Sequence, residues 1–74
     1  MMNGNEVVNG DMHRIDIVAE LHKRRVTLRE LSKNAGLKPD TLKNALYRSY
    51  PKGERIIADA LNMDPARIWP SRYE

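Results

Sequence analysis

The stretch that decides the fold is LRELSKNAGLKPDTLKNALY, residues 28 to 47. Apolar residues recur at helical spacing on both sides of Gly36, which predicts two short helices joined by a tight turn. Two helices that cross at a steep angle need a turn residue that tolerates positive φ and a small side chain at the crossing. Gly36 meets the first need, and Ser32 meets the second in place of the more usual Ala. The stretch therefore predicts a helix-turn-helix.

Local signals place the ends of these two helices. Thr27 and Glu30 have the spacing of a capping box, so the first of the two is expected to start at Thr27 and to end at Gly36. Pro39 suits the first turn of the second, because its missing N–H would have no partner there. That helix is expected to end near Arg48 or Ser49. The apolar residues expected to lock the pair together are Leu31, Ala35, Leu37, Leu42 and Ala45.

Helical patterns also flank this stretch. Asp11 is expected to cap a helix over about residues 12 to 25, and residues 1 to 11 are expected to form a flexible tail. Pro51 is expected to begin a helix that ends near Asn62, and a last short helix is expected from Asp64 and Pro65 to about Ile68, with Pro70 preventing its continuation. The prediction is an all-α domain over residues 12 to 74, a compact bundle of four helices plus a short fifth.

Composition excludes several functions. The 74 residues include 13 Lys and Arg, 10 Asp and Glu and no Cys. A single domain of this size has little room for a deep substrate cavity, so an enzyme is not expected, nor a cofactor or small-molecule ligand. His13 and His22 lack the cysteines of a usual zinc site, and no metal is expected. No apolar run approaches the ~20 residues that span a bilayer, and a cytoplasmic location without membrane contact is expected.

The net charge of +3 is unevenly distributed. Residues 22 to 55 carry ten basic and three acidic residues, a balance of +7, whereas residues 1 to 21 sum to −3 and residues 56 to 74 to −1. The basic section coincides with the predicted helix-turn-helix and its flanks. Such a coincidence is typical of a surface that binds a polyanion, although a solvated basic face is the alternative on charge alone.

The exposed side of the third helix is the candidate reading surface for double-stranded DNA in the major groove. Asn44 has the chemistry to pair with the N6 and N7 edge of adenine, and Lys43 or Arg48 with the O6 and N7 edge of guanine. Asp40 would accept from a cytosine amine or, as we favour, interact with the positive end of the helix dipole. The base-reading residues expected are Asp40, Thr41, Lys43, Asn44, Tyr47 and Arg48.

Phosphate contacts are expected from elements beside the reading helix, since backbone contacts position a protein on the duplex. The residues expected to make them are Arg29, Lys33, Lys38, Lys52 and Gly53, the last through a loop amide. Thr41 is expected at a phosphate or a thymine methyl. Tyr47 and Tyr50 lie at the end of the reading helix. Two roles are open for them: a hydroxyl that bonds a phosphate, or a ring that packs against the helix beginning at Pro51. Trp69, between Ile68 and Pro70, is expected in the core.

The sequence also resembles the Ner-like regulators of transposable bacteriophages and their bacterial chromosomal relatives. The resemblance covers nearly all of residues 12 to 73: HRIDIVAELHKRR at 13 to 25, NAL at 44 to 46, PKGERIIADAL at 51 to 61 and IWPSRY at 68 to 73. Met12 departs from it, at a position where an aromatic residue is expected. The resemblance implies a lambda-repressor-like DNA-binding domain that regulates transcription, in phage members by repressing early promoters.

The sequence is therefore compatible with two functions from different classes. The first is a sequence-specific DNA-binding regulator of transcription, a repressor by resemblance. The alternative is a helical protein interaction module, for example an accessory factor of a recombination or transcription complex. A single helix-turn-helix reads few base pairs, so two or more copies are expected on one operator. The apolar residues are expected to be used up in the core, leaving no dimer stripe.

Overall fold

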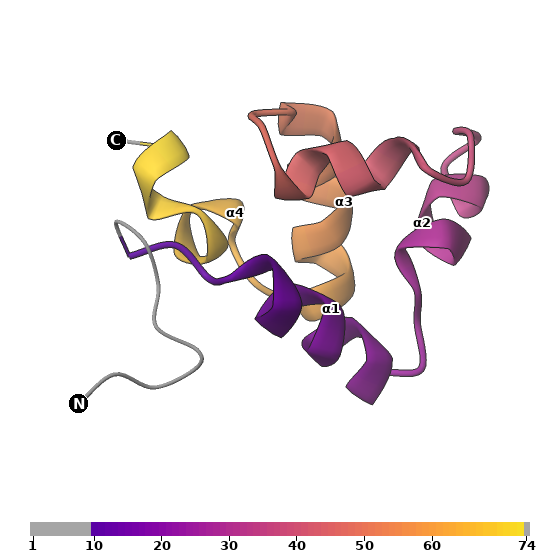
Figure 1. Ribbon diagram of the computed structural model, residues 1–74, viewed down its shortest axis with the longest axis horizontal. Coiled ribbons are helices and arrows are strands. Elements are labelled where there is room, and N and C mark those ends of the chain that lie inside the picture. Colours follow the sequence, from indigo (N-terminus) through magenta and orange to yellow (C-terminus); the bar gives the residue numbers. More distant parts are fainter. Residues whose placement is uncertain (1–9, 74) are drawn as a thin grey trace.

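A computed structural model of the chain describes residues 10–73. These residues form four α-helices and two 3-10 helices, and no strand occurs among them (Figure 1). In chain order the elements are α1 (Arg14–Lys23), α2 (Leu28–Asn34), η1 (Thr41–Leu46), α3 (Pro51–Leu61), α4 (Pro65–Ile68) and η2 (Pro70–Arg72). The predicted all-α class is confirmed. Most of the predicted tail, residues 1–9, lies outside the described residues.

The core is built around α3, which lies between η1, α1 and the C-terminal segment (Figure 1). Ile57, Ala58 and Leu61 of α3 are buried, and the core they form also includes apolar residues from α1, α2, η1 and α4. Trp69 is 2% exposed, so its predicted place in the core is confirmed. Burial of each large apolar side chain contributes about 1.5–3 kcal/mol to stability. The other buried core residues are Ile17, Leu21, Leu42, Ala45 and Ile68.

The first half of the helix-turn-helix forms as its local signals predict. Thr27 Oγ1 accepts the Glu30 N–H at 3.1 Å, and Glu30 Oε1 accepts the Thr27 N–H at 3.1 Å, which completes the capping box. At the other end Gly36 has φ +77°, and the Leu37 N–H donates to the Ser32 carbonyl at 2.8 Å. This is a Schellman ending, in which a left-handed residue lets the chain turn back on the last carbonyls of the helix.

Ser32 does more than fill the small space at the helix crossing. It is fully buried, and its Oγ accepts the N–H of Leu42 at 3.2 Å. Leu42 lies in the first turn of η1, where backbone N–H groups have no partner within the helix. Ser32 therefore joins the two helices by a hydrogen bond that the more usual Ala would lack.

The third helix differs from its prediction. It is a 3-10 helix that begins at Thr41, and Pro39 and Asp40 lie in the turn before it, where the Thr41 N–H donates to the Lys38 carbonyl at 3.0 Å. The expected start at Pro39 and the end near Arg48 or Ser49 are both wrong. In a 3-10 helix, residues three apart lie in line along one face.

The start and end of α1 also differ from the prediction. His13 is its N-cap, and His13 Nδ1 accepts the Ile15 N–H at 3.0 Å. The helix ends at Lys23 because Arg25 takes φ +61°, which lets the Val26 N–H donate to the Leu21 carbonyl at 3.0 Å. This ending resembles that of α2, but with Arg at the position that glycine usually fills.

Asp11 binds the C-terminal segment instead of capping α1. Its carboxylate accepts the Ser71 N–H at 2.9 Å and the Ser71 hydroxyl at 2.6 Å. Asp11, which the sequence placed in the tail, is thereby fixed to the folded domain. The Met12 N–H also donates to the Ile68 carbonyl at 2.8 Å. Two segments some 60 positions apart in the sequence are therefore joined by three hydrogen bonds.

The ends of α3 and the place of α4 agree with the sequence. α3 starts at Pro51 and is closed by Asn62, which takes the left-handed conformation with φ +57°. α4 covers Pro65–Ile68, although Asp64 makes no side-chain capping bond to it. Pro70 ends α4 as expected, but it also begins η2, a short turn that the sequence analysis did not predict.

Candidate nucleic-acid interface

One face of η1 presents polar side chains to solvent. Thr41 is half-buried, while Asn44 and Tyr47 are exposed. Because residues three apart share a face of a 3-10 helix, these three lie in a row. Lys43 and Arg48 are exposed on either side of it, and the opposite face is buried through Leu42 and Ala45. The structure thus places three of the predicted base-reading residues, Thr41, Asn44 and Tyr47, on one face of η1.

Exposed cations surround this row. Arg29 and Lys33 lie on α2, Lys38 lies in the turn before η1, and Lys52 lies in the first turn of α3. All four are exposed. The ion pairs of residues 10–73 are Lys23 with Glu20, Arg24 with Glu20 and Arg72 with Glu54, so none of the four has an acidic partner there. Their charge is therefore available to an anion.

Gly53 does not lie in a loop. It is buried in the first turn of α3, and a Cβ on it would lie 2.6 Å from Tyr50 Cδ2 and 3.1 Å from Leu42 Cδ2. Glycine is needed here so that the Tyr50 ring can pack on the helix backbone. Tyr50 is thus the tyrosine that packs against this helix, as one of the two alternatives predicted, and Tyr47 remains exposed.

Of the three acidic residues of the basic section, Glu54 is buried, whereas Glu30 and Asp40 are exposed. Glu30 is engaged in the capping box, and the charge of the buried Glu54 is balanced by Arg72. Asp40 is exposed and makes no side-chain capping bond to η1. The side-chain hydrogen bond to the first turn of η1 comes from Ser32, whose Oγ accepts the Leu42 N–H.

A group of side chains around the buried Glu54, which we call the Glu54 cluster, holds the end of η1. It consists of Glu54, Arg72, Tyr73 and the Ala45 carbonyl. Arg72 Nη1 donates to the Ala45 carbonyl at 2.6 Å and to Glu54 Oε2 at 3.0 Å, and the Tyr73 hydroxyl donates to Glu54 Oε1 at 2.6 Å. The Tyr50 N–H also donates to Glu54 Oε2, at 2.7 Å. The C-terminal segment thereby fixes both the end of η1 and the start of α3.

The ionisation of this cluster follows from its hydrogen bonds. Burial raises the pKa of Glu54, but hydrogen bonds from Tyr73, from the Tyr50 N–H and from Arg72 outweigh burial, and the pKa lies below its ordinary value. The hydrogen bond to Glu54 raises the pKa of Tyr73, as does its burial. The cluster is thus an ionised carboxylate held by neutral and cationic donors. Sequence reasoning missed this cluster, although Glu54 lies in PKGERIIADAL and Arg72 and Tyr73 lie in IWPSRY, two of the segments that carry the family resemblance.

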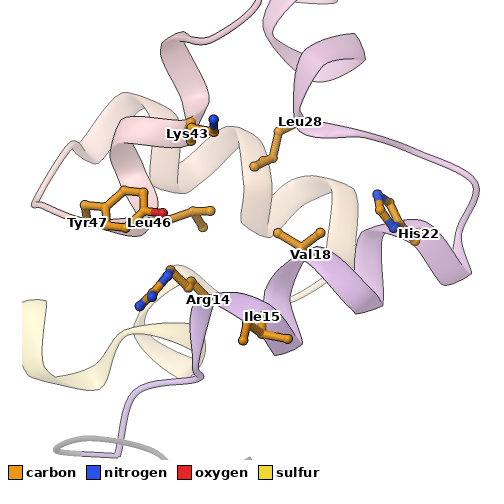
Figure 2. Close-up of a pocket in the computed structure, with 8 residues that line it drawn as sticks. All are labelled: Arg14, Ile15, Val18, His22, Leu28, Lys43, Leu46 and Tyr47. Atoms are coloured by element: carbon orange, nitrogen blue, oxygen red, sulfur yellow. The ribbon is translucent and has the colours of Figure 1, made fainter.

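An apolar groove lies between α1 and η1 (Figure 2). Its volume is about 400 Å³, and Ile15 and Tyr47 at its edge are 66% and 62% exposed. The expectation that the core uses up the apolar residues is therefore wrong at this place. The residues that line the groove are Arg14, Ile15, Val18, His22, Leu28, Lys43, Leu46 and Tyr47.

Two further expectations concern other kinds of site. None of the helices formed by residues 10–73 has the length and apolar character needed to cross a membrane. Within the same residues, no three His, Asp or Glu side chains lie together in a way that could hold a metal ion. His13 is used as a helix cap, and His22 is exposed at the groove.

The crossed helices α2 and η1, with an exposed polar row and cations that have no acidic partner within residues 10–73, define a helix-turn-helix DNA-binding module. A family described as winged helix-turn-helix DNA-binding matches residues 11–74. The chain belongs to this family, and within it to the Ner-like proteins. No strand that could form a wing is present in residues 10–73.

Individual relatives agree with this assignment. The chain is 62% identical over 63 residues to a negative regulator of transcription from Escherichia phage D108, which covers 85% of this chain and 86% of the relative. It is 52% identical to sugar fermentation stimulation protein B of Escherichia coli strain K12, over 85% of this chain and 68% of the relative. The solution structure of the Mu Ner protein is 55% identical, with a TM-score of 0.75 over 86% of both chains.

Proposed function

We propose that this chain is a negative regulator of transcription that binds a specific DNA sequence by placing η1 in the major groove. The observation that carries the proposal is the exposed row on η1, flanked by cations that have no acidic partner among the described residues. Relatives named as negative regulators of transcription support the direction of regulation.

Sequence preference comes from the side chains of η1. Asn44 pairs with adenine, and Lys43 or Arg48 pairs with guanine, since these side chains match the donors and acceptors of those base edges. Thr41 contacts a phosphate or a thymine methyl. Tyr47 ends the row, and Asp40 precedes it in the turn before η1. Thr41 is half-buried and its side chain is short, so the phosphate or methyl group that it contacts lies close to the backbone of η1.

Affinity comes from the cations beside η1. Arg29, Lys33, Lys38 and Lys52 neutralise phosphates on the strands that border the groove, and this contribution does not depend on base sequence. Gly53 lies in the first turn of α3, where backbone N–H groups point out of the helix N-terminus and can donate to an anion. Its contribution is therefore a backbone N–H at a phosphate. Two or more copies on one operator, with half-sites about one helical turn apart, supply the remaining specificity.

A footprint on the DNA around the chain's own gene tests this function. Purified protein is expected to protect a site that overlaps a promoter, and transcription from that promoter in vitro is expected to fall as the protein is added. Protection without a fall in transcription would contradict the negative regulation. The absence of any protected site would favour the alternative, a protein interaction module.

A further inference from the structure

We propose that Arg14, on α1 and outside the helix-turn-helix, is a phosphate anchor for DNA that the Tyr47 ring holds in place. The inference rests on the proposed function, because it requires η1 to enter the major groove. It adds to the interface a residue from an element that the helix-turn-helix motif does not include.

The first observation is the position of Arg14 relative to the row on η1. The Arg14 guanidinium carbon lies 5.2 Å from the centroid of the Tyr47 ring. Tyr47 is the last member of the row that begins at Thr41, and both Arg14 and Tyr47 are exposed. Figure 2 shows the two side chains at one end of the groove, one from each of the facing elements. Arg14 thus lies beside the last member of the row on η1.

The second observation is that Arg14 is free to bind an anion. No carboxylate of residues 10–73 lies within ion-pair distance of it. A guanidinium that lies over an aromatic ring keeps its N–H donors in its own plane, where they remain open to a bidentate acceptor such as phosphate. The stacking also limits the rotamers of the long side chain, which lowers the entropy lost on binding.

The third observation is the charge of the groove. Arg14 and Lys43 border an apolar floor formed by Val18, Leu28 and Leu46, and no acidic residue lines it. A second copy docked on this groove by two-fold symmetry would bring these cations close to their equivalents, which is unfavourable. A nucleic-acid strand has the opposite character, with anionic phosphates and apolar sugar faces. The strand that borders η1 is therefore the occupant that the groove fits.

The experiment compares Arg14→Gln with wild type and with Arg67→Gln, which removes an equal charge from an exposed position on α4. The probes are a duplex selected by the wild-type protein from a random pool and a scrambled duplex of the same composition. Dissociation constants are measured for both at about 50 and 200 mM salt. Each phosphate contact contributes about 0.9 to the slope of log affinity against log salt.

Arg14→Gln is expected to weaken binding to both duplexes by a similar factor. The ratio of the variant's dissociation constant to that of wild type is expected to fall about threefold as salt rises from about 50 to 200 mM, because the variant lacks one phosphate contact. Arg14→Gln is also made in two Tyr47 backgrounds. In Tyr47→Phe, where the ring remains, it is expected to weaken binding by the same factor as in the wild-type background, and in Tyr47→Leu by a smaller factor.

Three results would overturn the inference. Equal affinities for Arg14→Gln and Arg67→Gln would show that only net charge matters. A loss confined to the selected duplex would assign Arg14 to a base. A change in the sedimentation of free protein on Arg14→Gln would indicate a second copy in the groove. If wild type selects no sequence at all, the proposed function itself fails and the inference with it, whereas the first three results leave that function standing.

Discussion

The Glu54 cluster allows a quantitative test of what holds η1 against the rest of the domain. The change is Arg72→Leu, which keeps an apolar side chain against Trp69 but removes the hydrogen bonds that Arg72 Nη1 donates to the Ala45 carbonyl and to Glu54. The Glu54 side chain is 1% exposed and that of Arg72 is 16% exposed, so water cannot replace the lost partner. The variant leaves a buried carboxylate without its counter-ion.

The expected size follows from this burial. Removing one partner of a buried ion pair costs about 3–5 kcal/mol, and the lower end applies because Tyr73 and the Tyr50 N–H still donate to the carboxylate. A domain of this length has a free energy of unfolding of roughly 4–11 kcal/mol, so a loss of about 3 kcal/mol is a large part of its stability. An exposed arginine elsewhere is expected to cost no more than about 0.5 kcal/mol.

Urea denaturation followed by circular dichroism at pH 7 measures this difference. Arg67→Leu is the matched control, since that arginine is exposed on α4 and outside the cluster. The double variant Glu54→Leu with Arg72→Leu is expected to lose less than the sum of the single losses, because no charge remains buried. This account of the cluster would be refuted if Arg72→Leu lost less than about 1 kcal/mol, no more than the control, and if the two single losses added up in the double variant.

Three more predictions follow from particular contacts. Asn44→Ala is expected to relax base preference while Lys33→Ala weakens binding to all sequences alike, and selection from a random duplex pool with each variant checks this; the opposite pattern would place the reading surface elsewhere. Because hydrogen bonds hold the pKa of Glu54 below its ordinary value of 4.5, its stabilisation is complete above that value and is lost as the pH falls through the folded value. Glu54→Gln is therefore expected to show a shallower acid loss of stability in denaturation at several pH values, and an unchanged acid profile would count against the hydrogen bonds. Arg25→Gly is expected to raise the free energy of unfolding by up to about 1 kcal/mol, since it relieves a left-handed φ of 61°, and a destabilised variant in the urea titration would contradict this.

Much of the fold is predictable because its signals are local. The capping box at Thr27 and Glu30, the turn at Gly36 and the left-handed Asn62 each act through residues within a few positions. Backbone groups at a helix end need a partner nearby, so residue type and spacing are enough to locate the end. The small residue expected at the crossing was also confirmed, as the fully buried Ser32.

The parts that were wrong depend on contacts between distant segments. Asp11 has the sequence context of a helix cap, but its carboxylate binds Ser71, 60 positions away. Glu54 counts as one more acid in a charge tally, whereas in the structure it is buried, Arg72 balances its charge and Tyr73 donates a hydrogen bond to it. No periodic pattern links such positions. The spacing of apolar residues likewise did not predict the 3-10 form of η1, which packs against both α2 and α3.

The candidate site divides in the same way. Exposure of the η1 side chains could be predicted from the apolar stripe of Leu42 and Ala45, which fixes the buried face. The basic flanks could be predicted from composition. The stacking of Arg14 on Tyr47 could not, because the two residues are 33 positions apart and no periodic pattern links them.

The central claim is that η1 reads a specific DNA sequence. A titration of the purified protein against its selected duplex and against a scrambled duplex, at several salt concentrations, tests it most directly. The account predicts that the selected duplex binds more tightly by roughly 10³ or more, and that both affinities fall as salt rises. Equal affinity for the two duplexes would contradict it.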